Sequence, residues 1–394
     1  MKKNKLNFLY TNIGRGHPFY LDGIVELARE SKAFELSISD VFESSSDISN
    51  LSWQLARSLY KIGSTDSFVG RMYSKLRDSS DFNRQGLAMR IMGRDIKKKY
   101  HGDSAPLIVA HPVLVGILSG RTNLLYQHGE LAVPKQAVVS GAEYIFVPTE
   151  TAAEKFISGG YSSANVIVTG LCIEPCLEKQ AEQAFNIRMS RLDSSYKLTG
   201  GFFSSGAEPK PHIEKLILSA VSVVKQGHNV ILFAKKNGNL ASLIKREFEK
   251  RNIELIAIDD KSQKVESGSS AVLCLCSDRK AETELACRLF EKLDFFVAPS
   301  HERSNWALGL GLPMFILEPA IGPFSPLNRE ILLESGVAES LYSTKDSRQF
   351  GNRLNELKKS RKLQQMSESG WGKQSITGFK AIADFLVNKQ AQIA

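Results

Sequence analysis

Four side chains in the first third of this chain have the chemistry of general acids and bases. His17, His111, His128 and Glu130 each come shortly after an apolar run. Imidazole and carboxylate groups transfer protons when they lie within hydrogen-bond reach of a substrate. Each also has a structural interpretation, because a histidine at a helix start is often a cap or a core residue, and one before proline is often packed in a turn.

Three loops of the second half have the composition of anion-binding loops. Small residues let a ligand approach the backbone, and the free N–H groups at a helix N-terminus stabilise negative charge. The candidates are Gly200-Gly201, the run of Ser204, Ser205 and Gly206, and the segment Ser300–Ser304 with Arg303 as a counter-charge. An ordinary loop explains each segment as well as an anion-binding loop does, since glycine and serine are common at strand ends. No Asp-x-Asp clamp stands in a suitable loop, so backbone amides are the expected charge stabilisers and no metal is expected.

Alternating strands and helices must position these residues. In the first half we expect strands at Leu6–Tyr10, Phe34–Ser39, Leu107–Ala110, Leu124–Tyr126, Tyr144–Val147 and Asn165–Thr169. In the second half we expect them at Gly201–Ser204, Asn229–Ala234, Glu254–Ile258, Ala271–Cys276, Phe295–Ala298 and Met314–Leu317. Helical segments separate most of these runs, which is typical of an α/β fold with parallel sheets.

Two such halves predict two Rossmann-like domains facing each other across a cleft. We expect an N-terminal domain at 1–172, a linker at 173–196, a C-terminal domain at 197–371, and a final segment, 372–394, whose helix packs back on the N-terminal domain. A chain of 394 residues is long enough for two domains. No apolar run approaches the length of a membrane span or a signal-peptide core. The five cysteines fit neither a zinc nor a redox spacing and predict free thiols in a reducing cytosol.

Residues 51–101 carry most of the net positive charge of the chain. Eleven Lys and Arg against four Asp give this stretch +7 of the total +9. Aromatic residues and leucines lie between the basic ones, a pattern compatible with an anionic membrane surface. The alternative is a solvated helical face that covers the core. No nucleic-acid-binding motif accompanies the charge, so we expect no nucleic-acid partner. The predicted location is cytoplasmic, with association at the inner face of the plasma membrane as an extension.

Four segments, in this order, resemble a known enzyme group. They are Thr11–His17 with its Gly14-x-Gly16-His17 loop, the His-Pro turn in Val109–Pro112, the run Tyr144–Pro175, and the run Asp294–Ala338 with Gly311-Leu312-Pro313. Together they resemble the GT-B glycosyltransferases. Within that fold the chain is most similar to the family-28-like group that holds the glycosyldiacylglycerol synthases and the lipid-linked N-acetylglucosaminyltransferase of cell-wall synthesis.

The resemblance implies a reaction and several residue roles. A sugar would pass from a nucleotide-sugar donor to a lipid or glycan acceptor, with no cofactor. His17 would face the acceptor as general base, beside the loop glycines Gly14 and Gly16. Apart from the resemblance, His111 before Pro112 is a candidate for orienting substrate or, equally, a packed turn residue. Donor contacts are implied for Lys235, Asn237, Ser300, His301, Glu302, Arg303 and Asn328. His128 and Glu130 form a second acid/base-capable cluster.

One position departs from the group. Its members carry a glutamate five residues before the glycine of Gly-Leu-Pro, where the carboxylate binds the ribose hydroxyls, and this chain has Trp306 there. Glu302 is a candidate replacement. The departure leaves three hypotheses: a transferase with an altered donor site, a catalytically silent paralogue that acts as a binding subunit, and a nucleotide-sugar epimerase or NAD-dependent enzyme of similar shape. The hypothesis of an NAD-dependent enzyme takes Asp40 as the acid that binds the ribose. The motif Gly-x-Gly-x-x-Gly that it requires is incomplete, because Phe19 stands at the third glycine.

Overall fold

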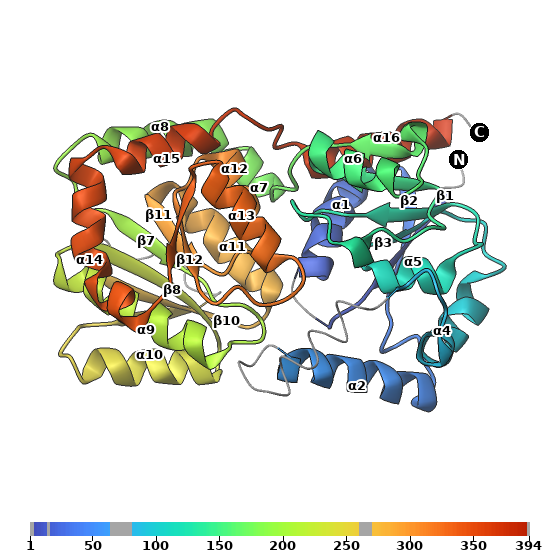
Figure 1. Ribbon diagram of the computed structural model, residues 1–394, viewed down its shortest axis with the longest axis horizontal. Helices are drawn as coiled ribbons and strands as arrows, with labels where there is room; N and C mark the ends of the chain where they lie inside the picture. Colours follow the sequence, from blue (N-terminus) through green and yellow to red (C-terminus); the bar gives the residue numbers. More distant parts are fainter. Residues whose placement is uncertain (1–3, 14–15, 64–80, 260–269, 392–394) are drawn as a thin grey trace. The chain divides into compact units, whose positions relative to one another are not determined.

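The computed structural model describes residues 4–13, 16–63, 81–259 and 270–391, and gives no side-chain detail for 59–63 and 390–391. The chain forms two compact units (Figure 1). Unit 1 comprises residues 1–173, 322–327 and 375–394, and unit 2 comprises residues 174–321 and 328–374. Within the described residues, no helix is long and apolar enough to cross a membrane.

Unit 1 is built on a six-stranded parallel sheet in the order β2-β1-β3-β4-β5-β6. The strands are β1 (Asn4–Tyr10), β2 (Phe34–Asp40), β3 (Leu107–Val109), β4 (Leu124–Gln127), β5 (Tyr144–Val147) and β6 (Val166–Val168). The first strand lies between β2 and β3, so the chain order reverses beside it. Ligands of such sheets bind at the carboxyl ends of the strands, at this point of reversal.

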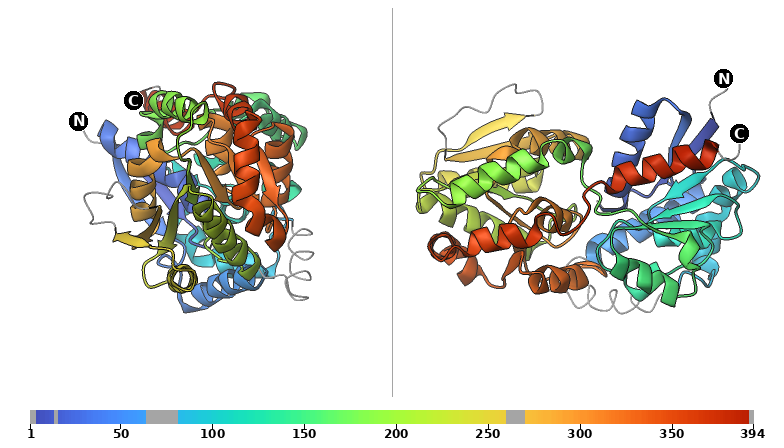
Figure 2. Two further views of the ribbon diagram at one scale, coloured as in Figure 1. Left: turned by 90° about the vertical axis from the view of Figure 1, so that its left-hand side faces the viewer. Right: turned by 90° about the horizontal axis from the view of Figure 1, so that it is seen from above.

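Helices cover the sheet of unit 1 on both faces (Figure 1). They are α1 (Gly16–Ser31), α2 (Asp47–Gly63), α4 (Leu87–Tyr100), α5 (Pro112–Leu118), α6 (Glu150–Ser158) and α16 (Gly378–Ala391), with short 3-10 turns at Lys135–Ala137 and Ser163–Asn165. The C-terminal helix α16 packs beside α1 (Figures 1 and 2). Gly23 permits this contact, because a Cβ there would lie 2.2 Å from the ring of Phe379.

Unit 2 contains a seven-stranded parallel sheet in the order β13-β12-β11-β7-β8-β10-β9. The strands are β7 (Thr199–Phe202), β8 (Asn229–Lys235), β9 (Ile256–Asp259), β10 (Ala271–Cys276), β11 (Phe295–Ala298), β12 (Met314–Leu317) and β13 (Ala338–Leu341). The chain order reverses between β7 and β11, which places the loops after these two strands side by side.

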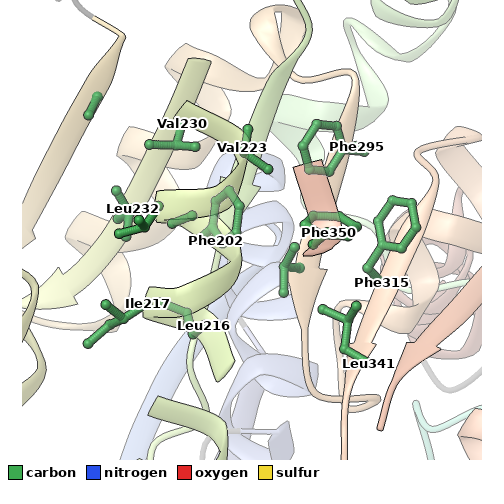
Figure 3. Close-up of a cluster of buried hydrophobic side chains, with 14 of the residues drawn as sticks. Phe202, Leu216, Ile217, Val223, Val230, Leu232, Phe295, Phe315, Leu341 and Phe350 are labelled. Carbon is green, nitrogen blue, oxygen red and sulfur yellow. The ribbon is translucent and has the colours of Figure 1, made fainter. Parts of the chain in front are cut away.

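The sheet of unit 2 also has helices on both faces. They are α7 (Pro175–Glu178), α8 (Ala181–Leu192), α9 (Lys210–Lys225), α10 (Asn239–Glu249), α11 (Arg279–Leu289), α12 (Ser304–Leu310), α13 (Ser325–Glu334), α14 (Thr344–Lys359) and α15 (Lys362–Gly370), with a 3-10 turn at Phe290–Lys292. Figure 3 shows the core between the sheet and its helices. There Phe315 lies against Phe350 and Phe295, with ring centroids 4.6 and 5.7 Å apart.

The predicted α/β class with two Rossmann-like units is confirmed. Four strands, Tyr144–Val147, Ala271–Cys276, Phe295–Ala298 and Met314–Leu317, have the predicted bounds. The range 173–196 differs from the predicted linker, because it contains α7 and α8, which belong to unit 2 from residue 174 onward. At least one charged residue of this range stabilises the fold of unit 2. Arg188 is fully buried and donates to the carbonyls of Leu293, Leu310 and Gly311.

The prediction of free thiols is corrected at one pair. Cys176 and Cys287 form a disulfide with a Cα–Cα separation of 6.1 Å. The two residues are 111 positions apart in sequence, and only the packing of α7 near α11 brings them together. Cys172, Cys274 and Cys276 are buried thiols outside this disulfide, in agreement with the prediction for them.

Candidate functional site

In unit 1, two histidines meet where the order of the sheet reverses. His17 lies in the first turn of α1, after β1, and His111 follows β3 directly before α5. Because β1 and β3 are neighbours, the loops at their carboxyl ends are adjacent. The two imidazole rings are in contact, with centroids 4.3 Å apart.

The hydrogen bond of His17 defines its protonation state. Its Nδ1 lies 2.8 Å from the carbonyl oxygen of Ala110. A carbonyl only accepts, so Nδ1 carries the proton and Nε2 presents a lone pair. Burial lowers the pKa of His17 to about 4, against a smaller opposing effect of the Ala110 hydrogen bond. The ring is therefore neutral at pH 7, as a general base requires.

His111 caps the N-terminus of α5. Its Nδ1 accepts a hydrogen bond from the backbone N–H of Val113 at 3.1 Å. The proton of this ring is therefore on Nε2. Burial, together with the neighbouring His17, lowers the pKa of His111 well below the ordinary value, so this ring is also neutral.

His128 and Glu130 lie at the carboxyl end of β4 and are both buried. The ring of His128 has a polar partner on each nitrogen: Nδ1 is 3.3 Å from the hydroxyl of Tyr126, and Nε2 is 3.1 Å from the carbonyl of Ala132. Burial lowers the pKa of His128 to about 3. Its contacts are those of a packed core histidine, in contrast to the single polar partner of His17.

The glycine loop before His17 is described in part. Gly14 lies outside the described residues, and Gly16 is the first residue of α1. Asp40, the acid on which an NAD reading relies, accepts from the side chain of Asn12 at 2.6 Å and from the backbone N–H of Phe42 at 2.8 Å.

In unit 2, the loop after β7 leads into α9. Ser204 and Ser205 are half-buried and Gly206 is exposed. Gly200 lies inside β7, where a Cβ would be 2.3 Å from the ring of Phe295, so sheet packing accounts for this glycine. On the neighbouring strand, Lys235 is exposed at the end of β8.

The turn after Lys235 contains Asn237 in the left-handed region, with φ of 61°. The amide of Asn328 donates to the carbonyl of Ser300 at 3.2 Å, which ties α13 to the loop after β11. His301 in that loop is half-buried, and burial lowers its pKa.

Arg303 is enclosed by opposite charges and aromatic rings. Its guanidinium lies 2.5 Å from Glu282 and 3.2 Å from Glu302, and all three side chains are buried. It also lies over the ring of Phe203, at 4.4 Å, and that of Trp306, at 5.3 Å. A diphosphate would have to compete with two carboxylates for this cation.

Trp306 occupies the position at which the resemblance implies a ribose-binding glutamate, and it is a core residue with 1% exposure. Its ring packs edge-on against Phe203 and Phe290. Its indole N–H donates to Glu174 Oε2 at 2.9 Å. Burial raises the pKa of Glu174, against the smaller effect of the Trp306 hydrogen bond.

Sequence reasoning missed Glu174 and Glu318. Both carboxylates could have been noticed from the sequence. Glu174 stands in the run that resembles the group's Gly-x-Pro pattern, and Glu318 lies at the end of an apolar strand, directly before Pro319. Glu318 is buried at the end of β12, where it accepts from Ser340 Oγ at 2.9 Å. Within the described part of the chain, no three His, Cys, Asp or Glu residues form a group that could hold a metal ion.

The architecture is shared with solved structures that differ strongly in sequence. No protein-family model and no curated protein sequence matches the chain. MnaA of S. aureus, in a co-structure with UDP, aligns with a TM-score of 0.55 at 12% identity over 99% of this chain and 97% of that one. The UDP-GlcNAc 2-epimerase of Neisseria meningitidis, bound to UDP-GlcNAc, aligns with a TM-score of 0.56 at 12% identity, over 98% and 100%.

MurG of Acinetobacter baumannii aligns with a TM-score of 0.54 at 10% identity, over 98% of this chain and 99% of that one. At these identities the likeness concerns the fold. The chain therefore has the two-Rossmann-unit fold, GT-B, that UDP-GlcNAc 2-epimerases and MurG have in common.

Proposed function

We propose that this chain is a glycosyltransferase in which His17 activates a hydroxyl of the acceptor. The observation that carries the proposal is the neutral imidazole of His17, held by the Ala110 carbonyl through Nδ1, at the reversal point of the unit 1 sheet. Nε2 takes the hydroxyl proton while the oxygen attacks the anomeric carbon of a nucleotide sugar. The bond from that carbon to the diphosphate breaks, and the nucleoside diphosphate leaves with the electron pair.

The diphosphate would bind at the reversal point of the unit 2 sheet. Ser204, Ser205 and Gly206 lie in the loop between β7 and α9, where their small side chains let a diphosphate approach the backbone. The first turn of α9 contributes less, because Pro211 has no N–H and the N–H groups of His212 and Ile213 donate to the carbonyl of Pro209. Lys235 is exposed at the end of the adjacent strand. We favour these groups over Arg303 as charge stabilisers, because Arg303 is already neutralised by two buried carboxylates.

We also expect residues near Arg303, in the loop after β11, to contact the donor. Ser300 and His301 lie at the end of β11, and Asn328 holds the Ser300 carbonyl. Glu302 is buried and paired with Arg303 through Oε1, so a ribose hydroxyl would compete with this ion pair. We therefore expect a donor whose ribose is bound differently from that of the resembling group.

A nucleotide-sugar epimerase is the second candidate. UDP-GlcNAc 2-epimerases are prominent among the structures of the same fold, and one is bound to UDP-GlcNAc. A neutral histidine can also remove a proton from carbon. A catalytically silent binding subunit is the third, in view of Trp306.

A donor screen separates these candidates. The chain is incubated with UDP-, GDP- and ADP-sugars in D2O, with and without lipid extract or soluble acceptors, and products are analysed by mass spectrometry. Acceptor-dependent release of nucleoside diphosphate supports the transferase. Acceptor-independent deuterium incorporation into the sugar supports the epimerase, and thermal stabilisation by a donor without either product supports the binding subunit.

An exposed apolar surface on α2 and α4 supports a lipid acceptor. Leu51 and Leu55 on α2 are 67% and 59% exposed, and Leu87 on α4 is 75% exposed. The two helices are joined, since Trp53, which is fully buried, donates from Nε1 to the carbonyl of Met92 at 3.1 Å. Trp53, one of the aromatic residues between the basic ones in 51–101, therefore belongs to the core and does not face a lipid surface.

Exposed basic side chains lie on α4 beside the apolar ones: Arg90, Arg94 and Lys98. Exposed leucines with neighbouring cations fit an anionic bilayer, for example at the inner face of the plasma membrane. Of the other aromatic residues between the basic ones, Tyr60 is in the part of α2 without side-chain detail, and Phe68 and Tyr73 lie outside the described residues.

Vesicle binding tests this surface. We expect binding to phosphatidylglycerol-containing vesicles and much weaker binding to phosphatidylcholine alone. The double variant Leu51→Gln/Leu55→Gln should lower the partition coefficient at least about tenfold, because each leucine loses apolar burial in the membrane. Ile157→Gln, at a residue 39% exposed on α6, is the control. If the double variant binds vesicles as strongly as Ile157→Gln does, the proposal that α2 and α4 contact the membrane is refuted.

A further inference from the structure

We propose that His111 is a second hydroxyl-binding group, a fixed hydrogen-bond donor that acts together with the acceptor nitrogen of His17. The two histidines would bind one neutral hydroxyl group: the hydroxyl donates its proton to His17 and accepts a hydrogen bond from His111. The inference rests on the proposed function of the same site, and it adds a positioning residue and a chemical requirement on the ligand.

A single turn of the backbone sets opposite tautomers on the two rings. The β3–α5 turn presents a carbonyl, that of Ala110, to Nδ1 of His17, and an N–H, that of Val113, to Nδ1 of His111. The first ring must donate and the second must accept. Nε2 is therefore a lone pair on His17 and an N–H on His111.

The geometry leaves both Nε2 atoms available to a ligand. The two nitrogens of an imidazole point in diverging directions, so rings held to the turn by Nδ1 direct Nε2 away from it. Their centroids are 4.3 Å apart. Among the described residues neither Nε2 has a hydrogen-bond partner, and both rings are only half-buried.

This arrangement selects a class of ligand group. A hydroxyl can donate to His17 and accept from His111 at the same time. A carboxylate has no proton for His17, and an ammonium has no lone pair for His111. As the hydroxyl oxygen gains negative charge, the N–H of His111 would stabilise it, and a donor already fixed in place is effective because it needs no reorganisation.

Two variants separate this role from simple capping. Asn and Asp are both strong N-cap residues, so His111→Asn and His111→Asp should keep α5 capped and the melting temperature nearly unchanged. His111→Asn should lower kcat/KM at least about tenfold, the lower range for losing one donor to a developing oxyanion. His111→Asp should also move the acid limb of the pH–rate profile to higher pH, because a carboxylate beside His17 raises the pKa of that histidine.

Among the described residues, His128 is also electrostatically coupled to His17, and it is unchanged in both variants. The exposed His101 provides a matched control, since His101→Asn should leave rate and profile unchanged. If both His111 variants keep the wild-type rate and pH profile, His111 is only a cap and the proposal fails.

A spectroscopic test does not depend on activity. Long-range ¹H–¹⁵N spectra of the full chain, assigned with His17→Gln and His111→Asn, report the tautomer of each ring. We expect Nδ1–H on His17 and Nε2–H on His111. The opposite tautomer on either ring would overturn the proposal. Absence of any sugar transfer by the wild-type chain would instead refute the proposed function, and the spectra would still decide the donor–acceptor pair.

Discussion

Replacing Trp306 tests whether the departure from the resembling group is structural. In Trp306→Phe the ring contacts with Phe203 and Phe290 are largely kept, but the N–H donor to Glu174 is lost. Leaving a buried acceptor without a partner costs about 1–3 kcal/mol. The smaller ring leaves a cavity that adds about 1 kcal/mol. We therefore expect a loss of about 2–4 kcal/mol in the free energy of unfolding of unit 2.

For a unit of this size the loss corresponds to a fall in melting temperature of roughly 5–15 °C. Circular dichroism on heating, with calorimetry to resolve the transition of unit 2, provides the measurement. Glu174→Gln is the matched control, because its carbonyl still accepts from the indole without a buried charge. Trp306→Phe should cost less in that background, since the acceptor left behind is neutral.

Two results would refute this reasoning. A melting temperature within 2 °C of wild type would mean that the Glu174 hydrogen bond does not stabilise unit 2. A raised KM for donor at unchanged stability would mean that the indole contacts the ligand.

The pH dependence provides an independent check. Burial raises the pKa of Glu174 in the folded chain, so the folded state binds its proton more tightly than the unfolded state does. Stability contributed by this carboxyl is therefore present at low pH and lost as pH rises from the ordinary carboxyl range through the raised pKa. The difference between wild type and Glu174→Gln should follow this sign.

Three further predictions concern other parts of the chain. His17→Gln should lower kcat by about 10²–10⁴-fold without changing the melting temperature, because it removes the base but keeps a polar side chain. Gly23→Ala should destabilise unit 1 by about 1–3 kcal/mol in chemical denaturation, because its Cβ would collide with Phe379. Reduction of Cys176–Cys287 should lower the free energy of unfolding by about 2–4 kcal/mol, since the bond closes a long loop, and thermal melts with and without dithiothreitol measure it.

Controls and contrary outcomes follow from the same contacts. Gly102→Ala should be neutral, because nothing lies within 4 Å of its added Cβ. A neutral Gly23→Ala would contradict the packing of α16 on α1. Full turnover by His17→Gln would remove that residue as the base. An unchanged melt in dithiothreitol would mean that the disulfide does not stabilise unit 2.

Some features of the candidate site could be predicted from local sequence. Residues such as His17 and Ser300 were placed at strand ends because apolar runs of four to seven residues, followed by polar loops, identify buried parallel strands. The α/β class followed from the same alternation. The departure at Trp306 was also visible, because it depends only on a count from Gly311.

Contacts between distant segments could not be predicted in this way. The range 173–196 has the composition of a connector, yet Arg188 is buried because three carbonyls at the ends of other elements accept its hydrogen bonds. The pairing of Cys176 with Cys287, and of Trp306 with Glu174 across 132 positions, depends on helix packing that no local pattern encodes.

The sequence by itself determined the α/β class, the loops that carry the polar residues and the approximate positions of β1 to β12, because period and turn chemistry are local. It did not predict β13. Only the tertiary structure decided which of these residues has an available reactive atom. Arg303 is paired with Glu282 and Glu302, and His128 has a polar partner on each ring nitrogen. His17 and His111 are instead held by one turn through Nδ1 alone among the described residues. The physical reason is that a tautomer, an ion pair or a lowered pKa depends on what surrounds a side chain in space.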